Sequence, residues 1–301
     1  MQQQSTLRQP TLDPSPGWSA SLKLVASRRG ERTVLSRNAH SGPLRVQRPF
    51  YPEGGICHVY VLHPPGGLVA GDKLDIDVHC ESASQLLLTT PSAGRVYCSN
   101  QQRLVQTQAV NIRVDAGARC EWLPQESIVF DRAEAVNRLS VSLAEGAQFN
   151  AWEVTCLGRP ASGELFEGGQ LQQSWEIYRE DRPLLLERAN FVGGSEQLQA
   201  AWGLGGATVV GTLVTTCDGS LVEQLRIAIE ALSKSGVCKS GDQSQPFNVP
   251  LFAVTALPEL VVVRAFAQSG ADVKNAFIAL WYLLRQAQSG QTGVAPRIWF
   301  T

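Results

Sequence analysis

Histidine is scarce in this sequence of 301 residues, and its four copies limit the metal sites that the chain can build. Three of them, His58, His63 and His79, lie near Cys57 and Cys80 in a stretch typical of strand, turn and strand. Adjacent side chains of a strand point to opposite faces, so the dipeptides Cys57-His58 and His79-Cys80 cannot supply four converging ligands. One histidine and one cysteine can still meet across a hairpin, but structural sites usually need four ligands. We therefore expect no closed metal site among these five residues.

Several catalytic motifs are absent as well. No G-x-x-x-x-G-K-[ST] segment occurs, which excludes a P-loop and the nucleotide hydrolysis that depends on one. Residues 203–206 (GLGG) begin like a dinucleotide-binding turn, but Thr208 stands where the third glycine belongs, and a strand rather than a helix is predicted to follow. There is no G-x-S-x-G elbow and no H-E-x-x-H pair. No motif therefore indicates an enzyme.

The sequence also lacks a long apolar run and an excess of charge of one sign. The longest apolar stretch of the predicted helical region, residues 276–284, is far too short to span a membrane, and no basic and then apolar leader opens the sequence. The formal net charge is −1, which favours neither nucleic acid nor an anionic membrane as a partner. Seven cysteines without paired spacing indicate reduced thiols. We expect a cytoplasmic protein in which residues 1–17, rich in Gln, Ser and Pro, form a disordered tail.

What the chain does contain is mainly β-structure. From residue 18 to about residue 267, short apolar or alternating runs are broken every 8–15 residues by Gly, Pro, Asn or Asp. We expect one domain over residues 18–301 that is β-rich over residues 18–217. The predicted strands are residues 19–24, 56–62, 74–78, 86–90, 104–114, 119–123, 149–157, 172–179, 184–191, 208–217 and 259–267.

A weak internal repeat indicates how these strands are arranged. Residues 83–91, 116–124 and 145–153 each pass from a turn of small residues into a strand, at a spacing of about 30 residues. Units of one turn and its strands bury a continuous core by stacking on their neighbours. The predicted fold class is therefore mainly β, a helical, β-helix-like stack of sheets with two α-helices in the C-terminal third.

The two helices are predicted over residues 218–235 and 271–288, with a polar loop over residues 239–250 between them. The second helix is apolar nearly all round. Such a helix must be covered either by the chain's own sheet or by another protein. On the second interpretation, Trp281 and Tyr282 contact the partner, since interface cores favour aromatic residues.

Carboxylates lie in or beside several apolar strands, where an unpaired charge is costly. One interpretation is that they form salt bridges on a solvated sheet face. The other is a water-filled internal passage, in which oxygen ligands hand a divalent cation along by weak binding at several sites. The candidate residues are Asp72, Glu126, Asp131, Glu153 and Glu187.

Four segments carry a family resemblance. Residues 63–72 read HPPGGLVAGD, residues 89–97 TTPSAGRVY, residues 122–131 WLPQESIVFD and residues 296–299 PRIW. In this order and at this spacing they resemble the UreD-type urease accessory proteins, called UreH in some lineages, and the resemblance runs from about Gly17 to the C-terminus. The matching positions are His63, Gly66, Gly67, Gly71, Asp72, Thr89, Thr90, Pro91, Gly94, Arg95, Tyr97, Pro124, Glu126, Phe130, Asp131, Pro296, Arg297, Ile298 and Trp299.

The resemblance implies a role in urease maturation rather than in catalysis. Proteins of this family act in nickel insertion, and they bind apo-urease and the helical accessory protein UreF, which recruits the nickel-carrying GTPase UreG. Their fold is described as helical stacked β-sheets with a small helical portion, and they are associated with a tunnel that carries nickel toward urease. The resemblance implies that acidic and hydroxyl positions of these segments line such a tunnel. Together with the interpretation as a water-filled passage, it makes all five carboxylates candidate transient nickel ligands, with no tightly bound cofactor. The candidate residues for contact with partner proteins are Trp281, Tyr282, Arg297 and Trp299.

Two other classes of function stay open from the residues alone. A β-helical carbohydrate-active enzyme, a lyase or a glycosidase, would use Glu126 or Asp131 with Glu153 as its pair of carboxylates. A metal-free interaction module would use the apolar helix and contain no metal path.

Overall fold

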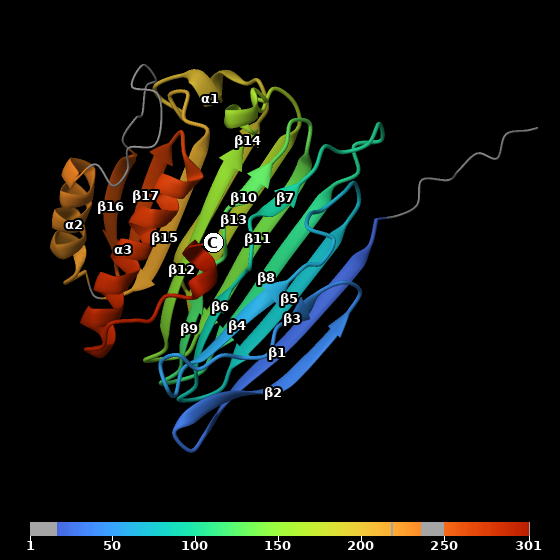
Figure 1. Ribbon diagram of the computed structural model, residues 1–301. Coiled ribbons are helices and arrows are strands. Elements are labelled where there is room, and N and C mark those ends of the chain that lie inside the picture. Colours follow the sequence, from blue (N-terminus) through green and yellow to red (C-terminus); the bar gives the residue numbers. More distant parts are fainter. Residues whose placement is uncertain (1–16, 218, 236–249, 301) are drawn as a thin grey trace, which may run out of the picture.

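The computed structural model describes residues 17–300 apart from 218 and 236–249. The predicted disordered tail and most of the predicted polar loop lie outside these residues. In the described part, two stacked β-sheets are flanked by helices on one side (Figure 1), so the predicted mainly β fold is confirmed.

One sheet has seven strands. Their spatial order is β14 (Arg182–Val192), β13 (Gln170–Arg179), β11 (Glu134–Leu143), β8 (Gln106–Val114), β5 (Lys73–Cys80), β1 (Ser19–Arg29) and β2 (Arg32–Ser41). The strands from β1 through β5, β8 and β11 to β13 are parallel, and the edge strands β2 and β14 are antiparallel to their neighbours.

The other sheet has ten strands. Its main order is β16 (Leu251–Leu257), β17 (Leu260–Ala267), β15 (Val209–Thr216), β12 (Gln148–Leu157), β9 (Arg119–Trp122), β6 (Gln85–Thr89), β4 (Cys57–Leu62) and β3 (Arg45–Val46). A short strand β10 (Ser127–Val129) pairs with β12 and with β7 (Gly94–Val96). The strands β4, β6, β9 and β12 are parallel.

The chain alternates between the two sheets in coils, as the repeat predicts. Strands β5, β6 and β7 form one coil, β8, β9 and β10 form the next, and β11 and β12 follow. The repeat units lie at the same level, because Gln85 and Gln148 both pair in register with Arg119. The turns before β9 and β12 contain Gly117 and Gly146 with φ of 68° and 71°, a region that glycine enters without a steric penalty.

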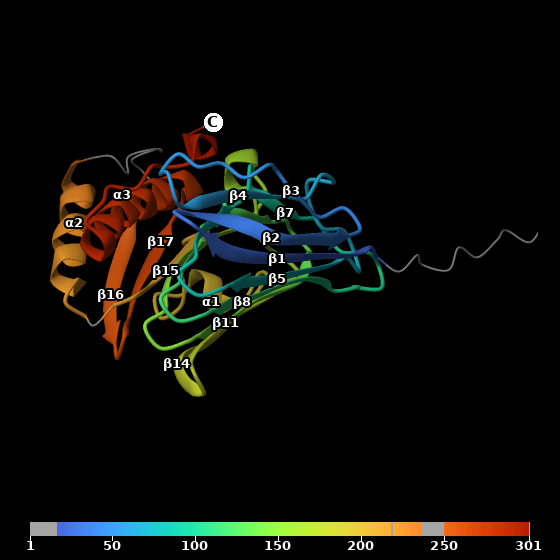
Figure 2. The ribbon, with the colours of Figure 1, turned by 90° about the horizontal axis from the view of Figure 1, so that it is seen from below.

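The two long helices lie together on the outer face of the ten-stranded sheet (Figures 1 and 2). Helix α3 (Gly270–Ser289) lies against β12, β15 and β17, and α2 (Val222–Ser235) lies beside α3 and β16. These two helices confirm the predicted pair. A short helix α1 (Glu196–Gln199) and two 3₁₀ turns, η1 (Pro160–Ser162) and η2 (Arg297–Phe300), complete the set in the described residues. None of these helices is long and apolar enough to cross a membrane.

The apolar side of α3 is covered by the chain's own sheet. Phe277 and Leu280 are fully buried, and Trp281 is 1% exposed. Gly211 on β15 lets the helix approach closely, since a Cβ there would lie 2.5 Å from a Val273 methyl carbon. Of the two interpretations of this helix, burial against the sheet therefore accounts for most of its apolar surface.

Candidate functional site

The four segments that carry the family resemblance meet at one end of the sandwich. The Leu68 amide donates to the Arg95 carbonyl at 2.8 Å, which joins the first segment to the second. Strand β7 of the second pairs with β10 of the third. The Trp299 indole of the last segment donates to the Thr89 hydroxyl at 2.8 Å. Four stretches far apart in the sequence thus form one local structure.

The glycines of the first segment are required by this packing. Gly66 and Gly71 have φ of 78° and 85°, in the left-handed region that favours glycine. Gly67 lies flat against the second segment, because a Cβ there would come within 2.5 Å of the Tyr97 ring and 2.8 Å of the Arg95 carbonyl oxygen. The loop can approach strand β7 only with glycine at this position.

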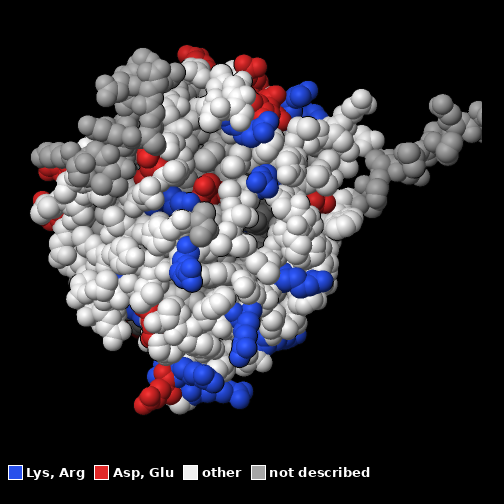
Figure 3. Space-filling view, in the orientation of Figure 1, with Lys and Arg blue, Asp and Glu red and all other residues white. Residues whose placement is uncertain are grey.

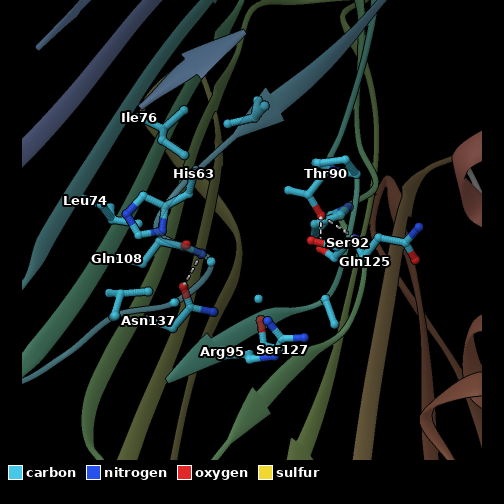
Figure 4. Close-up of a pocket in the computed structure, with 18 of the residues that line it drawn as sticks. His63, Leu74, Ile76, Thr90, Ser92, Arg95, Gln108, Gln125, Ser127 and Asn137 are labelled. Atoms are coloured by element: carbon cyan, nitrogen blue, oxygen red, sulfur yellow. Dashed lines mark hydrogen bonds between the residues drawn. The ribbon is translucent and has the colours of Figure 1, made fainter. Parts of the chain in front are cut away.

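A cavity of about 100 Å³ lies between the two sheets at this end. In Figure 4, His63 and Ile76 stand on one side of it, Thr90 and Ser92 on the other, and Arg95 lies below. Figure 3 shows a hollow in the face seen in Figure 1, with Lys and Arg side chains set around it. Residues of the first three segments therefore line a recess that leads into the space between the sheets, and the last segment lies outside its lining.

Polar side chains continue inward from this cavity. Gln108, Asn137 and Gln173 stand in register on β8, β11 and β13. A second cavity of about 40 Å³ lies beside all three of them and shares Gln108 and Asn137 with the first cavity. They divide the interior between two apolar clusters, one containing Leu139 and the other Ala135.

The facing sheet contributes polar residues at the same level. We call the whole layer the polar belt, and it consists of Gln108, Asn137, Gln173, Glu153, Thr155, Thr212 and Arg264. A belt of amides, hydroxyls and charges between two apolar clusters costs free energy unless its members hydrogen-bond to one another or to water.

Glu153 is the centre of the belt. Its carboxylate accepts hydrogen bonds from Asn137 Nδ2 at 3.2 Å, Gln173 Nε2 at 3.2 Å and the Trp175 indole at 3.0 Å. Burial raises the pKa of Glu153 to about 7 despite these hydrogen bonds, and the nearby Glu187 charge adds to the increase. At neutral pH this carboxyl group is thus partly protonated and partly ionised.

Two other candidate carboxylates hold loops in place. Asp72 accepts from the backbone amides of Trp18 at 2.8 Å and Val69 at 2.9 Å, which fixes the first segment to the start of β1. Asp131 accepts from the amide of Gly168 at 2.7 Å and from the amide before it at 2.9 Å. The backbone amides that they bind give both acids a structural role.

The last two candidates are paired with basic residues. Glu126 lies 3.3 Å from the Lys274 ammonium of α3. Glu187 forms a two-pronged ion pair with Arg264, with Nη1 at 2.7 Å from Oε1. Of the five candidate carboxylates, only Glu153 lines the cavity. The charge of Glu187 acts on Glu153, and the other three carboxylates lie outside the cavity lining. Glu126 and Asp131 do not line this cavity, so the structure places neither beside Glu153 there as the second carboxylate of a glycosidase.

The histidines and cysteines of the first third are also separated. His58 Nε2 lies 2.8 Å from Glu53, and His79 Nε2 lies 2.8 Å from Asp115. Cys57 and Cys80 are buried free thiols. Among the residues described, no three of His, Cys, Asp and Glu are grouped to hold a metal ion.

Comparison with known proteins identifies the family. The family described as UreD urease accessory protein matches residues 19–300. This chain belongs to the UreD family. It is 39% identical to the urease accessory protein UreD of Hahella chejuensis, over 94% of this chain and 91% of that protein. It is 40% identical to the urease accessory protein UreD of Dechloromonas aromatica, over 98% of this chain and 100% of that protein. It is 42% identical to the UreD protein of Azoarcus sp., over 95% of each chain. Membership supports a role in urease maturation.

The predicted partner contacts of this UreD-family chain fall into two groups. Trp281 and Trp299 are 1% and 3% exposed, and their rings meet edge-on with centroids 5.3 Å apart. They belong to the core and present no surface to another protein. Tyr282 is half-buried and Arg297 is exposed, so these two side chains remain accessible.

A buried ion network under α3 was not anticipated from the sequence. Arg285, fully buried, donates to Glu121 at 2.6 Å and also pairs with Glu53. Glu53 in turn accepts from His58. The one signal in the sequence is an arginine on the apolar face of the second helix, and nothing local indicates which acids it meets.

Proposed function

We propose that this UreD-family chain is a non-catalytic urease maturation factor that passes nickel toward the active site of apo-urease. In this proposal it works in the cytoplasm with apo-urease, a UreF-type protein and, through that protein, a UreG-type GTPase. Nickel is its cargo and not a tightly held cofactor. Neither nucleic acid nor a membrane is part of the proposal.

The observation that carries the proposal is the polar belt with Glu153 at its centre. Most of the interior on either side is apolar, so these groups do little for the packing of the core. Five of the seven belt residues line the two adjoining cavities, the first of which is also lined by the family segments. A carboxyl group with a pKa of about 7 is partly ionised at neutral pH, so a divalent cation can take the place of its proton at little cost.

The belt suits transfer better than storage. It offers one carboxylate, with amides and hydroxyls around it, and no cluster of three strong ligands in the described residues. Amide side chains can present either an oxygen or an NH₂ group. Asn137 and Gln173 can therefore donate hydrogen bonds to Glu153 when no cation is bound, and turn their oxygens toward a cation that passes. Weak binding at several positions lets an ion move on.

A steric block tests the route. Asn137→Leu fills the junction of the two cavities with an apolar side chain, whereas Asn111→Leu makes the same change on the outer face of the neighbouring strand. Urease is produced with the accessory proteins and each variant, and nickel per active site is measured beside co-purification of the complex. We expect at least a several-fold loss of nickel with Asn137→Leu, an intact complex, and normal loading with Asn111→Leu.

Full nickel loading with Asn137→Leu would instead favour the metal-free interaction module. In that case the half-buried Tyr282 and the exposed Arg297 would carry the function by partner contact alone.

A further inference from the structure

The polar belt continues beyond Glu153 to the edge of the sandwich. On the ten-stranded sheet, Glu153 of β12 pairs in register with Thr212 of β15, and Thr212 pairs with Arg264 of β17. Neighbouring strands are about 5 Å apart, so the Arg264 backbone lies roughly 10 Å from that of Glu153. Arg264 Nη1 donates to the Thr212 hydroxyl at 3.3 Å, which turns its side chain along the belt.

The facing sheet supplies the matching acid. Trp175, whose indole donates to Glu153, pairs in register with Glu187 on the edge strand β14. Arg264 donates to both carboxylate oxygens of Glu187, so one ion pair joins β17 of the ten-stranded sheet to the edge strand β14 of the seven-stranded sheet. The Arg264 and Glu187 side chains are 37% and 24% exposed, whereas Glu153 is 8% exposed. The ion pair therefore stands where the belt reaches solvent.

We propose that the Arg264–Glu187 ion pair is a gate that closes the end of the polar belt opposite the cavity mouth. This inference rests on the proposed function, because a gate has a role only if cations travel along the belt. With the gate closed, the guanidinium occupies the Glu187 oxygens, and its positive charge repels a divalent cation that arrives from Glu153. With Arg264 turned outward, Glu187, Thr212 and Glu153 face one another with oxygen ligands only.

The energetics suit a gate that opens. A partly exposed ion pair contributes little to stability, so a docking partner or an arriving cation can displace Arg264 at little cost. A fully buried pair such as Arg285–Glu121 would be far more expensive to open.

A second inter-sheet ion pair provides a matched control. Arg182, also on β14, pairs with Glu259 at the turn between β16 and β17, and the Arg182 side chain is 54% exposed. Neither residue lines a cavity of the belt. Arg182→Gln thus removes an ion pair between the same two sheets without touching the proposed gate.

The test is calorimetric titration of the full chain with NiCl₂. Removing the guanidinium in Arg264→Gln leaves Glu187 and Glu153 as two oxygen ligands with no cation between them. We expect this variant to bind one nickel ion at least tenfold more tightly than the unaltered chain. The double variant Arg264→Gln/Glu187→Gln should return to the weak binding of the unaltered chain, and Arg182→Gln should not change it.

Nickel binding by Arg264→Gln that is no tighter than that of the unaltered chain would overturn the gate. Equally tight binding by the double variant would also overturn it, because Glu187 would then play no part. If Arg264→Gln is too unstable to purify folded, nickel must restore its folding, since a ligand that binds only the native state stabilises it. Failure of nickel to do so contradicts the proposal. These measurements need no urease, so they are separate from the Asn137→Leu test of the route itself.

Discussion

Arg285 on α3 donates a hydrogen bond to Glu121 on β9 at 2.6 Å, with both side chains at most 1% exposed. The Trp281 indole donates to the same carboxylate at 3.0 Å. An apolar helix can slide or rotate on an apolar sheet, but a buried ion pair has one acceptable geometry. This pair therefore fixes the position of α3 on the sheet that also forms one wall of the polar belt.

Breaking the Arg285–Glu121 pair from one side should be severe. Glu121→Leu leaves the guanidinium with only Glu53 in the core, and we expect a loss of about 3–5 kcal/mol in the free energy of unfolding. Replacing both partners, as Glu121→Leu with Arg285→Met, should cost less than the single change, because the guanidinium is gone and the remaining acid, Glu53, keeps its hydrogen bond with His58. Urea denaturation followed by tryptophan fluorescence measures both, and a single-variant loss below about 1 kcal/mol would be incompatible with a buried pair.

Glu153 should make stability depend on pH. Because burial raises its pKa in the folded chain from 4.5 to about 7, the folded state favours the protonated form. The stability gained is complete below the unfolded value of 4.5 and is lost as the pH rises through about 7. Glu153→Gln has no such proton, so its unfolding free energy relative to the unaltered chain should rise by on the order of 2–3 kcal/mol between pH 5 and pH 8. A difference that stays constant over this range would show that Glu153 titrates normally.

Asp72 should behave as a structural residue. Asp72→Ala removes the acceptor of the Trp18 and Val69 amides, and we expect a loss of about 1–3 kcal/mol in unfolding free energy. The nickel content of urease per molecule of folded, complexed accessory protein should stay normal. A selective loss of nickel without a loss of stability would instead make Asp72 part of the route.

The two aromatic neighbours on α3 should respond differently. Trp281→Ala opens a cavity in the core, and we expect it to destabilise the chain by about 3–5 kcal/mol. Tyr282→Glu adds a charge to a half-buried position, so the circular dichroism spectrum should stay native while pull-down of a UreF-type protein weakens. Unchanged pull-down with Tyr282→Glu would remove this residue from the proposed interface.

Local patterns were enough to predict the stacked sheets and both long helices. The small-residue turns at Gly117 and Gly146 and the alternation of the strands are short-range signals, and the coils repeat them. The strands β2, β11 and β16 and the short strands β3, β7 and β10 escaped prediction. Polar residues fill much of β2 and β11, so neither has a run that stands out as apolar. Strand β16 is apolar at every position but Thr255, so its sequence does carry a strand signal.

The site was predicted only in part, because its residues are brought together by register between distant strands. Glu153 is a candidate from its apolar surroundings, but its partners Asn137 and Gln173 lie on the other sheet and have no unusual local context. Asp72 and Glu126 have similar apolar surroundings in the sequence but are not part of the belt. Asp72 binds backbone amides, and Glu126 pairs with a lysine. Sequence neighbours alone do not separate these roles.

The nickel content of urease made with Glu153→Gln tests the central claim most directly. The change keeps the shape of the side chain and removes the charge at the middle of the belt. Glu176→Gln is its matched control, since Glu176 lies on the outer face of β13 next to Trp175. We predict severalfold less nickel per urease active site with Glu153→Gln, normal nickel with Glu176→Gln, and an assembled complex in both. Full nickel loading with Glu153→Gln would contradict a route through the polar belt.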